Sequence, residues 1–287
     1  MSTNKNTNFM QRLVAALESK DSHVCVGLDS QYDRLPEFIK SNRSISEAIF
    51  AFNKEVIDVT SDIAVIYKMN VSFYAGYGSC GLEGLRLTNE YLKANFPEIP
   101  ILADCKRSEM GESVKMVAKE LFDWLGFDCV MVTPWFGFDT IRDYFTDETK
   151  GVVVYVHDSN PSAIEIQDLM LADGRKLYEE VARLVANDWN VNGNLWAEAA
   201  ATYPQQLKKI REIIGEEMPL LVAGVGAQGG KVEDLRSLFD KNGRRLLVNS
   251  SRGIIFAGSS CKDRDYFVEV RNAAVKLRDE LRLISGN

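Results

Sequence analysis

Two acids and a lysine that follow one short apolar run are the residues best suited to chemistry in this sequence. Asp104 and Lys106 stand two positions apart, which places both on one face of a strand, and Glu109 follows on the turn toward an amphipathic helical pattern at 110–125. Ionised groups packed this closely at the end of a buried strand are costly unless they pair. An ammonium held between acids stays protonated, so it can stabilise a developing negative charge and deliver a proton.

A glycine-rich segment and an arginine near the end of the chain form a second candidate site. Residues 224–230 contain four glycines in seven, among them Gly226, and also carry Gln228. Such a backbone can approach a ligand closely and turn its N–H groups toward an anion. Ser251 and Arg252 follow the last apolar run, and a guanidinium is a planar fork that matches phosphate oxygens. The glycine-rich segment and Arg252 together predict a phosphate site. The alternative is a flexible turn beside a surface arginine.

The segments that must position these residues follow one repeated pattern of strand and helix. Short runs rich in Val, Ile and Leu alternate with longer helical patterns, which predicts a parallel sheet that is buried on both faces. We expect strands at 23–29, 63–70, 100–104, 128–133, 151–157, 195–202, 219–224 and 245–250. Helical patterns lie near 45–61, 82–95, 110–125, 138–147, 174–188, 204–215, 231–240 and 263–284.

Eight strands that are each followed by a helix predict an α/β fold of the closed (β/α)8 type, a TIM barrel. An open doubly wound sheet is the competing fold, but the sequence lacks the GxGxxG motif after its first strand. We expect one domain over 1–287, in which residues 1–8 form a flexible tail and residues 70–84 form a loop on the active face.

Polar side chains stand at the carboxyl ends of nearly all these strands. They are Asp29, Lys68, Asp104, Lys106, Thr133, Asp158, Ser159, Thr202, Gln228, Ser251 and Arg252. In a barrel, all those ends converge on one face, where barrel enzymes do their chemistry, and phosphate often binds after the seventh and eighth strands. The pattern therefore predicts one site. A structural ion pair of Asp104 and Lys106 that plugs the barrel is the alternative.

Composition limits the remaining possibilities. The chain is 46% hydrophobic and 26% charged, as in ordinary globular proteins, and its net charge of −7 argues against broad nucleic-acid binding. Five cysteines without a CxxC pair or metal spacing indicate reduced thiols in a cytoplasmic protein. We expect no signal peptide and no membrane contact, since no run approaches about 18 apolar residues.

Taken together, these motifs resemble the orotidine 5′-phosphate decarboxylase family, in its longer bacterial-type subgroup. The matching segments, in family order, are 25–29 (CVGLD), 67–70 (YKMN), 104–107 (DCKR), 158–161 (DSNP), 201–204 (ATYP), 224–230 (GVGAQGG) and 251–254 (SRGI). The DxK spacing alone is shared by related barrel families. GAQGG and SRGI, with SNP upstream, are much more specific.

The resemblance implies cofactor-independent and metal-independent decarboxylation of orotidine 5′-monophosphate to uridine 5′-monophosphate, the last step of de novo pyrimidine synthesis. The family uses alternating Lys-Asp-Lys-Asp charges at the reacting carbon, and Lys68, Asp104 and Lys106 match the first three. Lys106 is then expected to protonate the pyrimidine C6. The fourth acid, matched by Glu109, comes from the second subunit of a homodimer, so the active site is shared.

The same resemblance implies the contacts of the nucleotide. Asp29 would contact the ribose, Ser159 the base edge, and Gln228 and Arg252 the 5′-phosphate. The complete expected substrate-binding set is Asp29, Ser113, Ser159, Thr202, Gly226, Gln228, Ser251 and Arg252.

The catalytic motif departs from the family pattern at and around the fourth acid. Glu109 and Ser113 stand where the family has Asp and Thr, and Asp158 stands where it has Thr before Ser-Asn. Glu is one methylene longer than Asp, and a displacement of about 1 Å can cost about 100-fold in rate. Two alternatives therefore stay open: a related metal-dependent decarboxylase or aldolase of phosphosugars, which would hold its metal through the DxKxxE acids, and a pyrimidine-nucleotide-binding paralogue with weak or no turnover.

Overall fold

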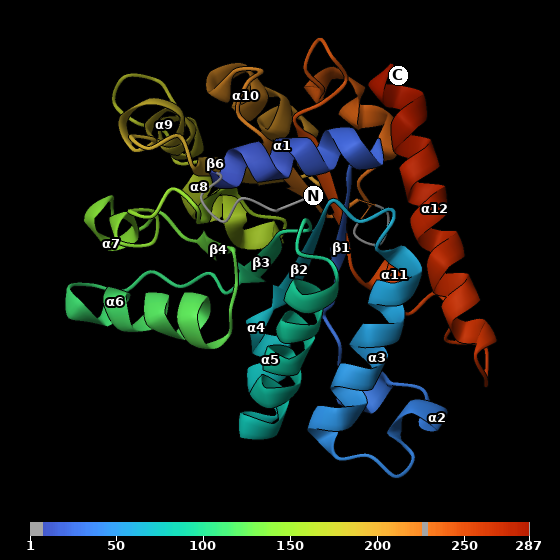
Figure 1. Cartoon of the computed structure of the whole chain (residues 1–287). Helices are drawn as coiled ribbons and strands as arrows, with labels where there is room; N and C mark the ends of the chain where they lie inside the picture. Colours follow the sequence, from blue (N-terminus) through green and yellow to red (C-terminus); the bar gives the residue numbers. More distant parts are fainter. Residues whose placement is uncertain (1–7, 226–228, 287) are drawn as a thin grey trace.

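Eight short parallel strands close into a barrel in the computed structural model, which describes residues 8–225 and 229–286. Each strand pairs with its neighbours in sequence, β8 pairs with β1, and helices surround the barrel (Figure 1). The strands are β1 (Val24–Gly27), β2 (Ile66–Asn70), β3 (Ile101–Asp104), β4 (Cys129–Val132), β5 (Gly151–His157), β6 (Leu195–Ala200), β7 (Leu220–Ala223) and β8 (Leu246–Ser250). The predicted (β/α)8 barrel is confirmed.

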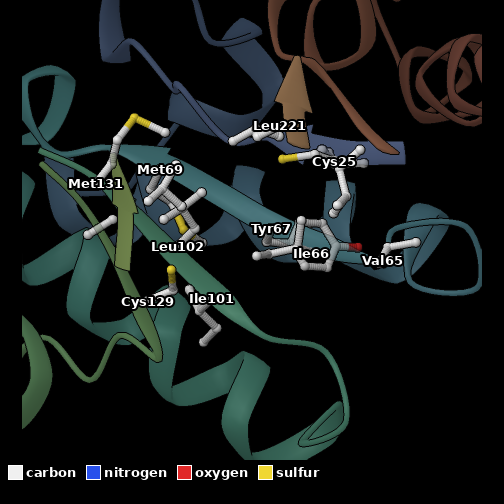
Figure 2. Close-up of a cluster of buried hydrophobic side chains, with 14 of the residues drawn as sticks. Cys25, Val65, Ile66, Tyr67, Met69, Ile101, Leu102, Cys129, Met131 and Leu221 are labelled. Carbon is white, nitrogen blue, oxygen red and sulfur yellow. The ribbon is translucent and has the colours of Figure 1, made fainter. Parts of the chain in front are cut away.

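The strands are buried along almost their whole length, which explains their continuous apolar character. Every side chain of β1, β3 and β4 is buried. One face of each strand packs into the barrel and the other packs under the helices, so neither face requires polar residues. Figure 2 shows side chains of β2, β3 and β4, among them Met69, Leu102 and Met131, gathered in this core. Full burial of one such side chain stabilises the fold by about 1.5–3 kcal/mol.

The longer helices follow the predicted patterns, with start and stop signals that the sequence carries. α3 (Ile45–Thr60) begins at a capping box, in which Ser44 Oγ accepts from the Glu47 N–H at 3.3 Å and the Glu47 carboxylate accepts from the Ser44 N–H at 2.8 Å. α10 (Pro204–Ile214) begins at a proline and ends before Gly215. Further helices, long and short, are α2 (Glu37–Lys40), α5 (Gly78–Asn95), α6 (Glu112–Ala118), α7 (Asp139–Arg142), α8 (Ile164–Gln167), α9 (Leu177–Arg183), α11 (Arg252–Ile255) and α12 (Asp265–Ser285).

Two predicted helical patterns fold differently. Residues 232–238 form a 3₁₀-helix, in which Val232, Leu235 and Leu238 recur every third position and pack toward the core. A 3₁₀-helix has three residues per turn, so these three side chains lie on the same side of it. The apolar face can therefore pack on the core without an α-helix. The pattern at 138–147 forms only the short α7, and Tyr144 and Phe145, which follow it, are both buried in the core.

Helix α1 (Phe9–Lys20) precedes the barrel and closes its amino-terminal end, opposite the carboxyl ends of the strands (Figure 1). Phe9 is fully buried, and a Cβ placed on Gly151 at the start of β5 would lie 2.4 Å from its ring. Asn8, which was expected to belong to the tail, instead caps this helix by accepting from the Met10 N–H at 2.8 Å. The rest of the predicted tail, residues 1–7, lies outside the described residues.

The predicted loop at 70–84 is wrong, because this stretch is largely helical. Asn70 caps α4 (Val71–Ala75), and α5 follows within three residues. The glycines that suggested a loop instead permit close packing. A Cβ on Gly81 would lie 2.0 Å from the Tyr74 carbonyl oxygen, and a Cβ on Gly84 would lie 3.0 Å from Ile49 on α3.

None of the helices in the described residues is both long and apolar enough to cross a lipid bilayer.

Candidate active site

A cavity of about 570 Å³ opens at the carboxyl ends of the strands, a size within the range of small-molecule sites. Many of the predicted site residues line it: Asp29, Lys68, Asp104, Lys106, Ser159, Ser251 and Arg252. The strand ends therefore converge as predicted. The acid–lysine cluster of β3 and the arginine that follows β8 share one cavity.

Four charged side chains, at or just after the ends of β1, β2 and β3, form the floor of this cavity. Lys68 Nζ lies 2.9 Å from Asp104 Oδ2 and 3.5 Å from Asp29 Oδ1, and the ammonium of Lys106 pairs with the other oxygen of Asp104. Burial alone would lower the pKa of Lys68, but the charges of Asp104 and Asp29 outweigh burial and raise that pKa. Burial would raise the pKa of Asp104, but Lys68 and Lys106 together lower it. Both shifts favour a fully ionised cluster.

Lys106 reaches into the open part of the cavity from an unusual backbone. Its side chain is 40% exposed, against 6% for Asp104. β3 ends at Asp104, and Lys106 has a φ of +53°, in the left-handed region that is costly for a residue with a Cβ. Its ammonium lies 4.9 Å from the centre of the Tyr155 ring, a cation–π contact. The ammonium is thus held between a carboxylate and an aromatic face.

Cys105, between the two charged residues, points away from them. Its Sγ donates to the Met131 carbonyl oxygen at 3.2 Å, and burial raises the pKa of this thiol to about 11. The side chain is therefore a packing group at neutral pH.

Asp29 and Ser159 approach the cavity from β1 and β5. Asp29 Oδ1 accepts from the Asn70 N–H at 3.0 Å, which fixes the carboxylate beside Lys68. Thr202 is not among the residues that line the cavity; its hydroxyl donates to the Ser159 carbonyl oxygen at 3.5 Å. Thr202 therefore supports the segment that carries Ser159.

Asp158 also lines the cavity, but its carboxylate is already engaged. Asp158 Oδ2 accepts from Gln167 Nε2 at 2.7 Å, and the Asp158 N–H donates to Gln167 Oε1 at 2.8 Å. This pair of bonds ties the end of β5 to α8.

The end of the cavity where the sequence predicts a phosphate site is formed by the segments after β7 and β8. Gly224, Val225, Ser251, Arg252 and Gly253 line it. The hydroxyl of Ser251 is buried rather than turned to the cavity, because the missing side chain of Gly27 leaves room for it: a Cβ there would lie 1.8 Å from Ser251 Oγ. Gly226 and Gln228, two of the predicted phosphate ligands, lie outside the described residues.

Glu109 and Ser113 do not line this cavity within the chain. Both are exposed, and Ser113 Oγ donates to the Met110 carbonyl oxygen at 2.7 Å, with Glu109 Oε2 at 3.4 Å. Lys106 is therefore flanked by Asp104 and not by Glu109 of its own chain.

Several lining residues were not predicted. Glu198 is a buried carboxyl group in the middle of β6, and burial, followed by the charge of Asp104, raises its pKa to about 8. An acid inside an apolar strand was the sequence signal that could have found it. Arg34, whose guanidinium lies 3.8 Å from the centre of the Phe256 ring, also lines the cavity. No sequence signal marked Arg34.

Comparison with known proteins agrees with the geometry. Residues 22–262 match the model of the orotidine 5′-phosphate decarboxylase / HUMPS family. Curated relatives called orotidine 5′-phosphate decarboxylase include that of Aromatoleum aromaticum, 36% identical over 278 residues and covering 96% of this chain and 98% of the relative. That of Janthinobacterium sp. is 34% identical over 274 residues, with 95% of this chain and 97% of the relative covered.

Solved structures give the same result. The structure of Leishmania donovani OMP decarboxylase has a TM-score of 0.82 at 26% identity and covers 98% of this chain and 100% of its own. A putative orotidine-monophosphate decarboxylase from Toxoplasma gondii has a TM-score of 0.83 at 27% identity, with 99% of each chain covered. The resemblance drawn from the motifs is confirmed: this chain belongs to the orotidine 5′-phosphate decarboxylase family.

Proposed function

We propose that this chain decarboxylates orotidine 5′-monophosphate to uridine 5′-monophosphate, the last step of pyrimidine nucleotide synthesis, through Lys106. Family membership over nearly the full length supports the overall reaction. The observation that carries the assignment of residues is the ionised Lys68–Asp104–Lys106 cluster, which shares one nucleotide-sized cavity with Arg252.

The chemistry requires a charge at the reacting carbon. Departure of carbon dioxide leaves an electron pair on C6 that no conjugated system can absorb. The Lys106 ammonium stabilises that pair as it develops and then transfers a proton from Nζ to C6, which leaves a neutral amine. Asp104 keeps the amine protonated until then, since a carboxylate in contact favours the charged form. Lys68 holds Asp104 in place and offsets its charge.

The nucleotide then spans the cavity from the charged floor to the rim. We assign the ribose to Asp29 and Lys68, the base edge to Ser159, and the 5′-phosphate to Arg252 together with the segments 224–230 and 251–253. Gly226 and Gln228 belong to this phosphate assignment on the motif alone. Thr202 acts through Ser159, to which it is hydrogen-bonded.

The site is completed by a second copy of the chain. Glu109 is exposed, and large apolar side chains of the segments that follow the neighbouring strands β3 and β4 are exposed as well: Met110 at 67%, Met116 at 64% and Phe136 at 59%. Exposed apolar side chains in one region are typical of a surface that another protein covers. We assign this surface to the partner in a homodimer, with Glu109 and Ser113 of the partner subunit at the cavity. A single domain per subunit in the cytoplasm, with its five cysteines reduced, completes the proposal.

The experiment is direct. Purified protein is incubated with orotidine 5′-monophosphate at neutral pH, with and without a chelator, and carbon dioxide release and the loss of orotidine absorbance are recorded. Turnover that a chelator does not change is expected. Turnover of a phosphosugar that a chelator abolishes would assign the chain to the metal-dependent alternative. Tight binding of uridine 5′-monophosphate without turnover would make it a nucleotide-binding paralogue.

A further inference from the structure

Glu198 is a carboxyl group that the proposed mechanism leaves without a role. It lies in the middle of β6 between Ala197 and Ala199, is only 2% exposed and lines the cavity. β6 places it level with Tyr155 on β5 and with Leu221 on β7. An acid at such a position is rarely kept for stability, because an apolar side chain would be favoured there.

Charged and titratable groups face Glu198 from several elements around the barrel. The groups that interact electrostatically with Glu198 are Cys25 of β1, Lys68 of β2, Asp104 of β3, Lys106, Tyr155 of β5 and Asp158. The two lysines are already balanced by Asp104 and Asp29. An ionised Glu198 would therefore add an uncompensated negative charge to the floor of the cavity, which burial makes costly.

The protonation state of Glu198 follows from these surroundings. Burial raises its pKa to about 8, and the charge of Asp104 contributes. At neutral pH most of the population is then a carboxylic acid with a proton to donate. Within the part of the chain that the structure describes, its Oε2 has no hydrogen-bond partner. A buried donor without an acceptor is destabilising, and the cavity that Glu198 lines beside Tyr155 gives a bound ligand room to supply an acceptor.

We infer that Glu198, as a neutral carboxylic acid, donates a hydrogen bond to an anionic group at the reacting carbon of the bound nucleotide. This inference rests on the proposed function, which places that carbon beside Asp104 and Lys106. Its chemical consequence is selectivity: the protonated acid accepts a nucleotide with a negative group at C6, whereas the ionised acid repels it. A nucleotide with only hydrogen at C6 makes no use of Glu198.

The test compares two ligands at two pH values. The first is 6-hydroxyuridine 5′-monophosphate, whose C6 oxygen is ionised at neutral pH, and the second is uridine 5′-monophosphate. Their dissociation constants are measured by calorimetry at pH 7 and pH 9, in buffers of different ionisation enthalpy, for the unchanged protein, Glu198→Gln and Glu198→Val. Circular dichroism checks that each variant is folded.

For the unchanged protein, binding of the C6-oxyanion nucleotide is expected to weaken about tenfold from pH 7 to pH 9, relative to uridine 5′-monophosphate, and to take up a proton at pH 9. The amide of Glu198→Gln donates but cannot ionise, so the affinity ratio of the two ligands should stay constant with pH and proton uptake should vanish. Glu198→Val should lose about tenfold in affinity for the oxyanion ligand alone at pH 7.

Two results would overturn the inference: the same pH dependence in Glu198→Gln as in the unchanged protein, or an equal loss for both ligands in Glu198→Val. If Glu198→Val does not fold, Glu198→Gln and the proton uptake decide alone. Failure of the unchanged protein to bind uridine 5′-monophosphate at either pH would be a different result, since it would refute the assignment of the cavity to a nucleotide and the role of Glu198 with it.

Discussion

Lys68 on β2 and Asp104 on β3 form a buried ion pair of 2.9 Å whose two side chains are only 4% and 6% exposed. The pair crosses neighbouring parallel strands, in which Lys68 stands level with Leu102 and Asn70 stands level with Asp104. Asp104 also holds the ammonium of Lys106 with its second oxygen. Lys68 therefore holds the Asp104 carboxylate, and that carboxylate holds the ammonium of Lys106, the proposed proton donor. The stability of the fold and the proposed proton transfer both depend on the Lys68–Asp104 contact.

Removing one partner of that pair should destabilise the fold strongly. In Lys68→Met, Asp104 loses its most buried partner, and breaking a buried pair typically costs about 3–5 kcal/mol. Urea unfolding measures the loss. Lys54→Met is the matched control, because Lys54 and Asp58 form an exposed pair on α3, for which about 0–1 kcal/mol is expected. Equal losses in the two variants would show that the Lys68–Asp104 pair is not a structural anchor.

Lys106 should be needed for turnover but much less for stability. Lys106→Met removes the only group assigned to protonate C6, and loss of a general acid typically lowers kcat by about 10²–10⁴. Steady-state kinetics gives that figure, and the melting temperature should move little because Lys106 is 40% exposed. Lys276→Met, on the exposed surface of α12, is the control and should keep full activity. A Lys106→Met protein as active as the control would remove Lys106 from the mechanism.

The barrel and its charged floor could be predicted from the sequence because both depend on strong local patterns. Buried parallel strands read as continuous Val, Ile and Leu, and barrel closure brings every strand end to one face. Residues 70–84 were misread because Gly81 and Gly84 serve close helix packing as well as they would serve a loop. The apolar spacing of Phe9, Leu13 and Leu17 is the local pattern behind α1, a helix that lies outside the eight strand–helix repeats.

Within the site, the sequence shows which residues end a strand but not how far each side chain reaches. Lys106 was expected to continue the strand of Asp104, but its backbone has a positive φ and is not extended. Its long side chain nevertheless pairs with Asp104. Glu109 is five positions from Asp104 but does not line the cavity. Glu198 was missed because its importance depends on long-range neighbours from β2 and β3, which only the closed barrel brings near.

Arg252 should govern affinity for the phosphate and not for the nucleoside. A charge-assisted hydrogen bond contributes about 1.5–3 kcal/mol, so Arg252→Ala should weaken uridine 5′-monophosphate binding about 10- to 100-fold. Binding of uridine, which lacks the phosphate, should be unchanged. Calorimetry with both ligands measures the difference. Arg236→Ala, on the 3₁₀-helix at 232–238, serves as the control substitution. A loss of the same size for uridine would place Arg252 at another part of the ligand.

Glu198 should make the fold less stable as pH rises. Its pKa is about 8 when folded, against an ordinary value of 4.5, so the folded chain holds a proton that the unfolded chain has released. This contribution is fully present below about pH 4.5 and is lost as pH rises through about 8, at no more than about 1.4 kcal/mol per pH unit. Urea unfolding at pH 6 and pH 9 should show a smaller loss for Glu198→Gln than for the unchanged protein. Identical losses would mean that Glu198 is ionised at both pH values.

Hybrid dimers test whether Glu109 completes the site of its partner. Lys106→Met and Glu109→Gln should each be nearly inactive alone, because every site in either homodimer lacks one group. When the two are unfolded together and refolded, half the dimers are hybrids, and each hybrid carries one site with both groups intact if the site is shared. About a quarter of the unchanged activity should then return. If Glu109 served its own subunit, every site would stay defective and mixing would restore nothing. An unmixed sample of each variant, refolded in parallel, controls for the procedure.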